Sequence, residues 1–66
     1  MKIRINGNLK EIGSIRTVAE LLDVLGIPPS SALIEQNGNV IARPDFQITA
    51  VNEGDAIEIV QMVAGG

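Results

Sequence analysis

Residues 17–26 read TVAELLDVLG, and they predict the helix around which the other segments are arranged. Thr17 and Glu20 form a capping box at its start, since each side chain can accept a hydrogen bond from the other residue's free backbone N–H. Gly26 can adopt the left-handed conformation that ends a helix, and the prolines at 28–29 prevent continuation. The apolar residues recur on one helical face: Val18, Leu21, Leu22 and Leu25.

Two Asn-Gly pairs, at residues 6–7 and 37–38, predict a hairpin on each side of this helix. Asn and Gly both tolerate the positive φ angles that a two-residue type I′ turn requires. The first residues of the chain alternate apolar and polar side chains, which is typical of a strand with one buried face. The expected strands are residues 1–6 and 8–12 before the helix, and residues 31–36 and 39–41 after it.

The longest strand signal lies at residues 56–63 (AIEIVQMV). Two turns are predicted before it: one at 44–46, whose Phe46 is expected in the core, and one at 52–55, where Glu53 and Asp55 are expected to be solvated. Hairpin, helix, hairpin and final strand give an α+β chain of ββαββ type. The first and last strands then lie side by side in a mixed sheet with the helix packed on one face. This is the β-grasp (ubiquitin-like) fold, expected as one domain over residues 1–63.

The composition excludes most catalytic chemistry. The 66 residues include no Cys, His, Trp or Tyr, and 45% are apolar and 20% charged, with a formal net charge of −3. Without Cys or His, the chain has neither a thiolate nor an imidazole for a nucleophilic site, and it lacks nitrogen and sulfur ligands for zinc. Glu53 and Asp55 lack the spaced oxygen ligands of a calcium loop. We therefore expect no enzyme activity, no metal and no bound cofactor.

Charge and hydropathy also restrict the partners and the location. A pI of about 4.6 and the lack of stacking aromatics argue against nucleic acid as a partner. The apolar runs are only a few residues long, so we expect no membrane-spanning segment, and the N-terminus does not resemble a signal peptide. We expect a cytoplasmic protein that is a monomer on its own.

The strand alternation separates a covered face of the sheet from an open face. Glu35 and Glu58 are expected to point to water, which turns Ile34 and Ile57 towards the helix. A chain of this size needs nearly every large aliphatic residue for its core, so apolar side chains left on the open face suggest a partner. The alternative is ordinary scattered surface apolars. The predicted partner-docking residues are Leu33, Val60 and Met62.

The last three residues, Ala64, Gly65 and Gly66, carry almost no side chain and are expected to form a flexible tail. Three extended residues reach about 10 Å at ~3.3 Å each, which is enough to enter another protein's active site while the folded domain stays outside. Gly65, and Ala64 to a lesser degree, can thread a narrow channel because the glycine backbone is unrestricted. The terminal carboxylate of Gly66 is then the reactive group that the chain presents.

Six segments in order give the chain a family resemblance: Asn6-Gly7, TVAELL at 17–22, LGI at 25–27, EQNG at 35–38, EGDAIEIV at 53–60 and Gly65-Gly66. Together they span the chain, which resembles the ThiS family, the ubiquitin-like sulfur carriers of thiamine biosynthesis. Each segment alone is weakly specific for the family, whereas the order and spacing of all six together are fairly specific. Two positions depart from the family pattern. Ala64 stands where many relatives carry a further Gly, and Gln61 stands where a basic residue is common.

The resemblance implies a cycle that other proteins perform on Gly66. A ThiF-type adenylyltransferase uses ATP to convert the carboxylate to an acyl-adenylate, and sulfur from a cysteine-derived persulfide, supplied by a donor such as a cysteine desulfurase, displaces AMP. The resulting thiocarboxylate gives its sulfur to thiazole formation on a ThiG-type thiazole synthase. The same resemblance assigns tail threading to Gly65 and Ala64.

Three alternatives remain open from the sequence. The small subunit of molybdopterin synthase also ends in Gly-Gly on this fold, and the synthase that co-purifies would distinguish the two. A carrier that is also conjugated to lysines, as ubiquitin is, would form isopeptide adducts. A β-grasp module that binds by its surface alone would keep its function after Gly65 and Gly66 are deleted.

Overall fold

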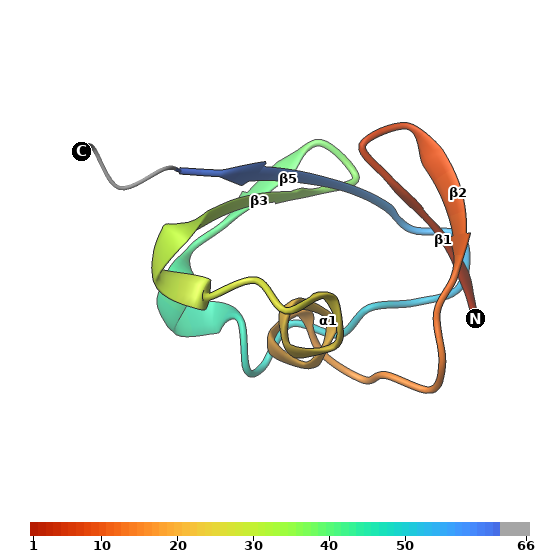
Figure 1. Cartoon of the computed structure of the whole chain (residues 1–66), viewed down its shortest axis with the longest axis horizontal. Coiled ribbons are helices and arrows are strands. Elements are labelled where there is room, and N and C mark those ends of the chain that lie inside the picture. Colours follow the sequence, from red (N-terminus) through yellow and green to blue (C-terminus); the bar gives the residue numbers. More distant parts are fainter. Residues whose placement is uncertain (63–66) are drawn as a thin grey trace.

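A five-stranded sheet forms one layer of the molecule, and the helix α1 (Val18–Leu25) lies across one of its faces (Figure 1). The computed structural model describes residues 1–62. The strand order is β2-β1-β5-β3-β4, in which β1 and β5 are adjacent and parallel while the other neighbours are antiparallel. The strands are β1 (Lys2–Ile5), β2 (Asn8–Glu11), β3 (Ala32–Gln36), β4 (Asn39–Ile41) and β5 (Ala56–Gln61).

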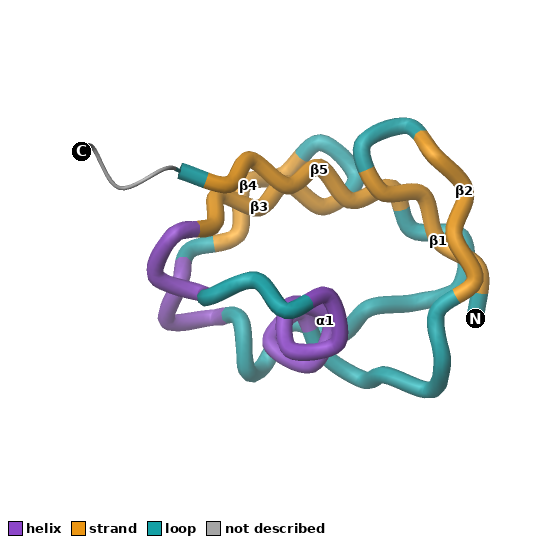
Figure 2. The backbone as a smooth tube through the Cα atoms, in the orientation of Figure 1, coloured by secondary structure: helices purple, strands orange, loops and turns teal. Residues whose placement is uncertain are grey.

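This topology confirms the predicted β-grasp arrangement, with the first and last strands side by side in a mixed sheet (Figure 2). Both hairpins contribute two strands, so the described residues follow the order ββαβββ, which has one strand more than the expected ββαββ. The strand β5 ends at Gln61 in the described part of the chain. Val63, the domain boundary predicted after it, and the tail at 64–66 lie outside the described residues.

Both Asn-Gly pairs form the turns that the sequence predicts. Asn6 and Gly7 have φ angles of 51° and 84°, and Asn37 and Gly38 have φ angles of 51° and 86°. Two successive positive φ angles are the requirement of a type I′ turn, whose twist matches that of the strands it joins. The two turns therefore fix the pairing of β1 with β2 and of β3 with β4.

The helix begins and ends where the sequence predicts, with one difference in its cap. Thr17 Oγ1 accepts a hydrogen bond of 3.2 Å from the Glu20 N–H. The Glu20 carboxylate accepts from the N–H of Arg16 at 3.2 Å, and not from that of Thr17 as a regular capping box would have it. At the other end Gly26 has a φ of 72°, and the Ile27 N–H donates to the Leu22 carbonyl at 2.9 Å, which closes the helix.

The core fills the space between α1 and the covered face of the sheet, and Phe46 lies in it as predicted. Its fully buried large side chains are Ile3, Val18, Leu21, Leu22, Ile34 and Ile57. The expectation that nearly every large aliphatic residue is core is wrong. Large apolar side chains stay exposed at Leu9, Val24, Leu33, Val40, Ile48, Val60 and Met62. Leu9 on the edge strand β2, Val40 on the three-residue strand β4 and Val24 on α1 all point away from the space between the helix and the sheet.

Two residues, Ser31 and Asp55, differ from the expected structure. Ser31, predicted as strand, belongs to the 3₁₀ turn η1 (Pro29–Ser31), because its N–H donates to the Pro28 carbonyl at 3.0 Å. The turn predicted at 44–46 is present as η2 (Arg43–Asp45). Asp55, predicted to be solvated, is 8% exposed, and its hydrogen bonds are described below.

Candidate docking surface

The open face of the sheet presents the apolar side chains that the sequence predicts there. Leu33 on β3 lies directly opposite Val60 on β5, and their exposed fractions are 52% and 58%. Met62 follows β5, is 46% exposed, and its N–H donates to the Ser31 carbonyl at 2.7 Å. Their neighbours Ile34 and Ile59 are buried beneath. The outward orientation of the three residues is confirmed, while their docking role stays a prediction.

A fourth apolar residue, which was not among the predicted docking residues, lies on this face. Val40 on β4 lies opposite Glu35 on β3 and is 69% exposed. The signal was the alternation within residues 39–41, where the half-buried Ile41 takes the inward position. A hollow of about 120 Å³ on this face is lined by Leu33, Ile34, Glu35, Val40, Glu58 and Val60. We refer to Leu33, Val40, Val60 and Met62, with Glu35 and Glu58 between them, as the outer patch.

Asp55 anchors the strand pairing that positions the outer patch. Its carboxylate accepts hydrogen bonds from the Asn52 N–H at 2.8 Å, from Gln36 Nε2 at 2.9 Å and from Asn37 Nδ2 at 3.1 Å. Asn37 Oδ1 in turn accepts from the Ala56 N–H at 2.9 Å. This network joins the end of β3 to the start of β5, and so fixes the register on which the outer patch depends.

The same network sets the protonation of Asp55. Burial alone raises the pKa of the carboxyl, but the hydrogen bonds from Asn52, Asn37 and Gln36 outweigh it and hold the pKa below its ordinary value. The expected solvation of Asp55 is therefore wrong, because three N–H donors replace water around an ionised group. The composition of the turn at 52–55 did not indicate this burial, since two of the three donors, Gln36 and Asn37, come from a distant hairpin.

Glu53 and Asp55 direct their oxygens to protein donors. Both carboxylate oxygens of Glu53 accept from the Lys2 N–H, each at 3.1 Å. In the part of the chain that the structure describes, no three His, Cys, Asp or Glu side chains come together to hold a metal ion.

No helix among residues 1–62 has the length and apolar character needed to cross a membrane.

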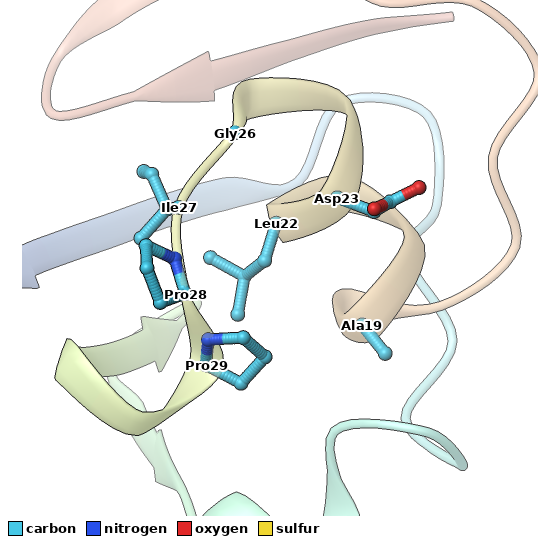
Figure 3. A pocket seen from close by; sticks show the side chains of 7 residues that line it. All are labelled: Ala19, Leu22, Asp23, Gly26, Ile27, Pro28 and Pro29. Atoms are coloured by element: carbon cyan, nitrogen blue, oxygen red, sulfur yellow. The ribbon is translucent and has the colours of Figure 1, made fainter.

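A second hollow, of about 330 Å³, lies on the helix side, between the end of α1 and the loop that follows it (Figure 3). Leu22 points towards Pro28 and Pro29, whereas the Asp23 carboxylate points away from them. Apart from Asp23, the residues that line it are apolar or glycine. The hollow thus lacks the convergent polar groups that orient a small ligand.

The residues to which the sequence assigns the chemistry, Ala64, Gly65 and Gly66, lie outside the described residues. Met62 is the last described residue, and it follows β5 two positions after Val60, with its N–H bonded to the Ser31 carbonyl. The position of Met62 therefore places the end of the described chain at the outer patch.

Comparison with known proteins identifies the family. The model of the ThiS family matches residues 3–66. The chain belongs to the ThiS family. The structure is similar to the crystal structure of the thiamine biosynthesis protein ThiS from Geobacter metallireducens, with a TM-score of 0.83 and 32% identity over 100% of both chains. The solution structure of a thiamine biosynthesis protein from the same organism also gives a TM-score of 0.83 and 32% identity, over 100% of this chain and 88% of that one.

Two curated relatives of this ThiS-family chain are much longer than it is. The chain is 35% identical over 66 residues to a thiazole synthase of Paramagnetospirillum magneticum and 33% identical over 66 residues to a thiazole synthase of Magnetococcus marinus. It matches in full but spans only 20% of the length of each. A ThiS-like segment therefore occurs within polypeptides that are named for the synthase.

Proposed function

We propose that this chain is a sulfur carrier of thiamine biosynthesis, and that the carboxylate of Gly66 carries the sulfur. The observation that supports this best is the ThiS family match, which extends through the Gly-Gly pair to residue 66. The side chains include no Cys or His. A terminal carboxylate is therefore the group best suited to form a covalent acyl intermediate, once another protein has activated it.

The chemistry proceeds in three steps on partner proteins. A carboxylate oxygen of Gly66 attacks the α-phosphorus of ATP on a ThiF-type adenylyltransferase, which releases pyrophosphate and forms the acyl-adenylate. The terminal sulfur of a persulfide, supplied by a donor such as a cysteine desulfurase, attacks the carbonyl carbon and expels AMP. A second thiol of the donor system then cleaves the sulfur–sulfur bond, which leaves the Gly66 thiocarboxylate and a disulfide.

The sulfur acceptor that we propose is the precursor from which a ThiG-type thiazole synthase forms the thiazole. Support comes from the two relatives named thiazole synthase, which contain a segment 33–35% identical to this chain. A segment that works on the synthase gains effective concentration when it is part of the same polypeptide. The separate chain would reach the synthase by docking through the outer patch and presenting Ala64, Gly65 and Gly66 to its active site.

Reconstitution tests this function. The purified chain is incubated with ATP, the ThiF-type adenylyltransferase and the sulfur donor of the same organism, and its intact mass is measured. The mass should rise by the difference between sulfur and oxygen, and a variant lacking Gly65 and Gly66 should stay unchanged. An unchanged wild-type mass would contradict the proposal. Sulfur transfer to a molybdopterin precursor instead of thiazole, or adducts on lysines, would assign the carrier to another pathway.

A further inference from the structure

We propose that Glu35 and Glu58 together bind one arginine side chain of the protein that docks on the outer patch. This inference deepens the proposed function and rests on it, because it specifies the chemistry of the adenylating partner's contact surface. The occupant is a guanidinium group presented by that partner, with its aliphatic stem lying against the apolar rim of the outer patch.

The pairing register brings the two carboxylates together. Glu35 on β3 is the direct cross-strand partner of Glu58 on β5, and both side chains point to the open face. Directly opposite residues of an antiparallel pair have Cβ atoms about 5 Å apart, which lets both side chains reach one group above the sheet. A planar guanidinium has five N–H donors, so it can bond to two neighbouring carboxylates at once, whereas an ammonium group acts as a point charge.

The chain does not neutralise these charges itself. Among residues 1–62 the ion pairs join the N-terminal amine to Glu11 and Arg16 to Glu20, so neither Glu35 nor Glu58 has one. Arg4 is the basic residue whose strand position is nearest to Glu58. It lies opposite Ala56 on β5, two positions before Glu58, and forms no ion pair with it. The two carboxylates are therefore available to a cation from outside the described part of the chain.

The surroundings suit a contact that becomes dry on binding. Leu33, Val40 and Val60 line the hollow of about 120 Å³ together with the two glutamates. Covering these apolar side chains removes water from the carboxylates, and a charge-assisted hydrogen bond is stronger in such a medium than in water. The same covering would make the carboxylates costly to bury without a cation, so the pair selects a partner that brings one.

Repulsion between the two carboxylates destabilises the free chain, which points to a role for the pair in binding. Like charges directly opposite each other in a sheet are destabilising. A polar but neutral pair would keep the face soluble without that penalty. Charge complementarity with a basic partner is thus the property that the two glutamates add to this face.

The test compares isosteric neutral variants with a distant one. We would measure binding kinetics of the full chain and the ThiF-type adenylyltransferase for wild type, Glu35→Gln, Glu58→Gln, the double variant and Asp23→Asn. Asp23 is an exposed carboxylate on α1, so its replacement changes the net charge equally without touching the outer patch. Thermal unfolding of each variant checks that the fold persists.

A shared arginine predicts a specific pattern. Glu35→Gln and Glu58→Gln should each weaken binding roughly tenfold or more, mainly through faster dissociation, as expected for loss of a hydrogen bond to a charged group. The loss in the double variant should differ from the sum of the two single losses, because both carboxylates bind one cation and are therefore coupled. Asp23→Asn should change only the association rate, and the glutamine variants should unfold at the wild-type temperature or above it.

An alanine scan of the partner's surface arginines identifies the occupant. One substitution should weaken binding to wild type and have little further effect on Glu35→Gln. Glutamine variants that bind as wild type does, or that resemble Asp23→Asn in changing association alone, would overturn the inference. If wild type acquires sulfur at Gly66 while those variants bind normally, only this inference fails, whereas wild type that is never adenylated overturns the proposed function.

Discussion

Asn6 pairs with Ile59 through both atoms of its side-chain amide. Its Nδ2 donates to the Ile59 carbonyl at 3.1 Å, and its Oδ1 accepts from the Ile59 N–H at 2.7 Å. Because β1 ends at Ile5, the side chain of a turn residue continues the hydrogen bonding along β5 for one more position. Asn6 thus forms part of the hairpin turn and also holds the final strand, on which Val60 points outward and which Met62 follows.

Replacing Asn6 by Gly tests this double role. Gly keeps the positive φ of the turn but removes both hydrogen bonds to Ile59, so the free energy of unfolding should fall by about 1–3 kcal/mol, at ~0.5–1.5 kcal/mol for each bond. Urea denaturation measures the change. Asn8→Gly, on the other side of the same turn, is the control, because the Asn8 side chain forms no hydrogen bond within the described residues. Equal losses for the two variants would show that the amide contributes nothing.

Asp55 predicts how stability depends on pH. Its pKa is lower in the folded chain than in the unfolded one, so its ionised form stabilises the fold above the unfolded value, about 3.9, and this stability disappears as the pH falls through the folded value. Urea midpoints measured from pH 7 to pH 2 should decline in acid for wild type. Asp55→Asn should be less stable at neutral pH and should lose part of that acid decline. Asp23→Asn should keep it, and parallel curves for wild type and Asp55→Asn would count against the network.

Gly26 tests the helix end. With φ of 72°, Gly26→Ala should lower the free energy of unfolding by about 1–2 kcal/mol, the penalty of a left-handed conformation for an L-residue. An added Cβ would meet nothing within 4 Å, so the loss would be conformational and not steric. Gly13→Ala is the matched control, because Gly13 also has open space around it and no positive φ. A neutral result at both positions would argue against the observed helix cap.

Charge placed on the outer patch should block docking without unfolding the chain. Met62→Glu and Val60→Glu each put a carboxylate on a surface that a partner is expected to cover, and each should slow adenylation at least about tenfold, as removal of a central interface residue does. Val24→Glu and Ile48→Glu are controls, because these side chains are exposed apolar residues away from that face. If all four variants are adenylated at the wild-type rate, the outer patch is not the docking surface.

Local signals in the sequence were enough to predict the helix and both hairpins of this fold. The capping residue Thr17, the terminal Gly26 and both Asn-Gly turns act over a few residues, and each lies where it was predicted. The outward positions of Leu33, Val60 and Met62 followed from period-two alternation, once the two glutamates had fixed the face. These features depend on neighbouring residues alone, so they can be predicted from the sequence without a structure.

The features that the sequence did not predict depend on contacts between distant segments. The burial of Asp55 requires donors from the β3–β4 turn, and the amide pairing of Asn6 requires β5, more than fifty residues away. The outward position of Val40 had a local signal in the alternation within residues 39–41, but its place opposite Glu35 follows from the pairing of β3 with β4. That Glu35 lies opposite Glu58 also follows from register, which neither strand encodes by itself.

The most direct test of the central claim is the intact mass of the protein isolated from cells that make thiamine. The measurement locates the last residue of the mature chain and the group that it carries. A sulfur carrier should end at Gly66, with a fraction heavier by the replacement of one oxygen by sulfur, and with that increase confined to the C-terminal peptide. A chain that ends elsewhere, or a Gly66 carboxylate that stays unmodified in cells that are synthesising thiazole, would contradict it.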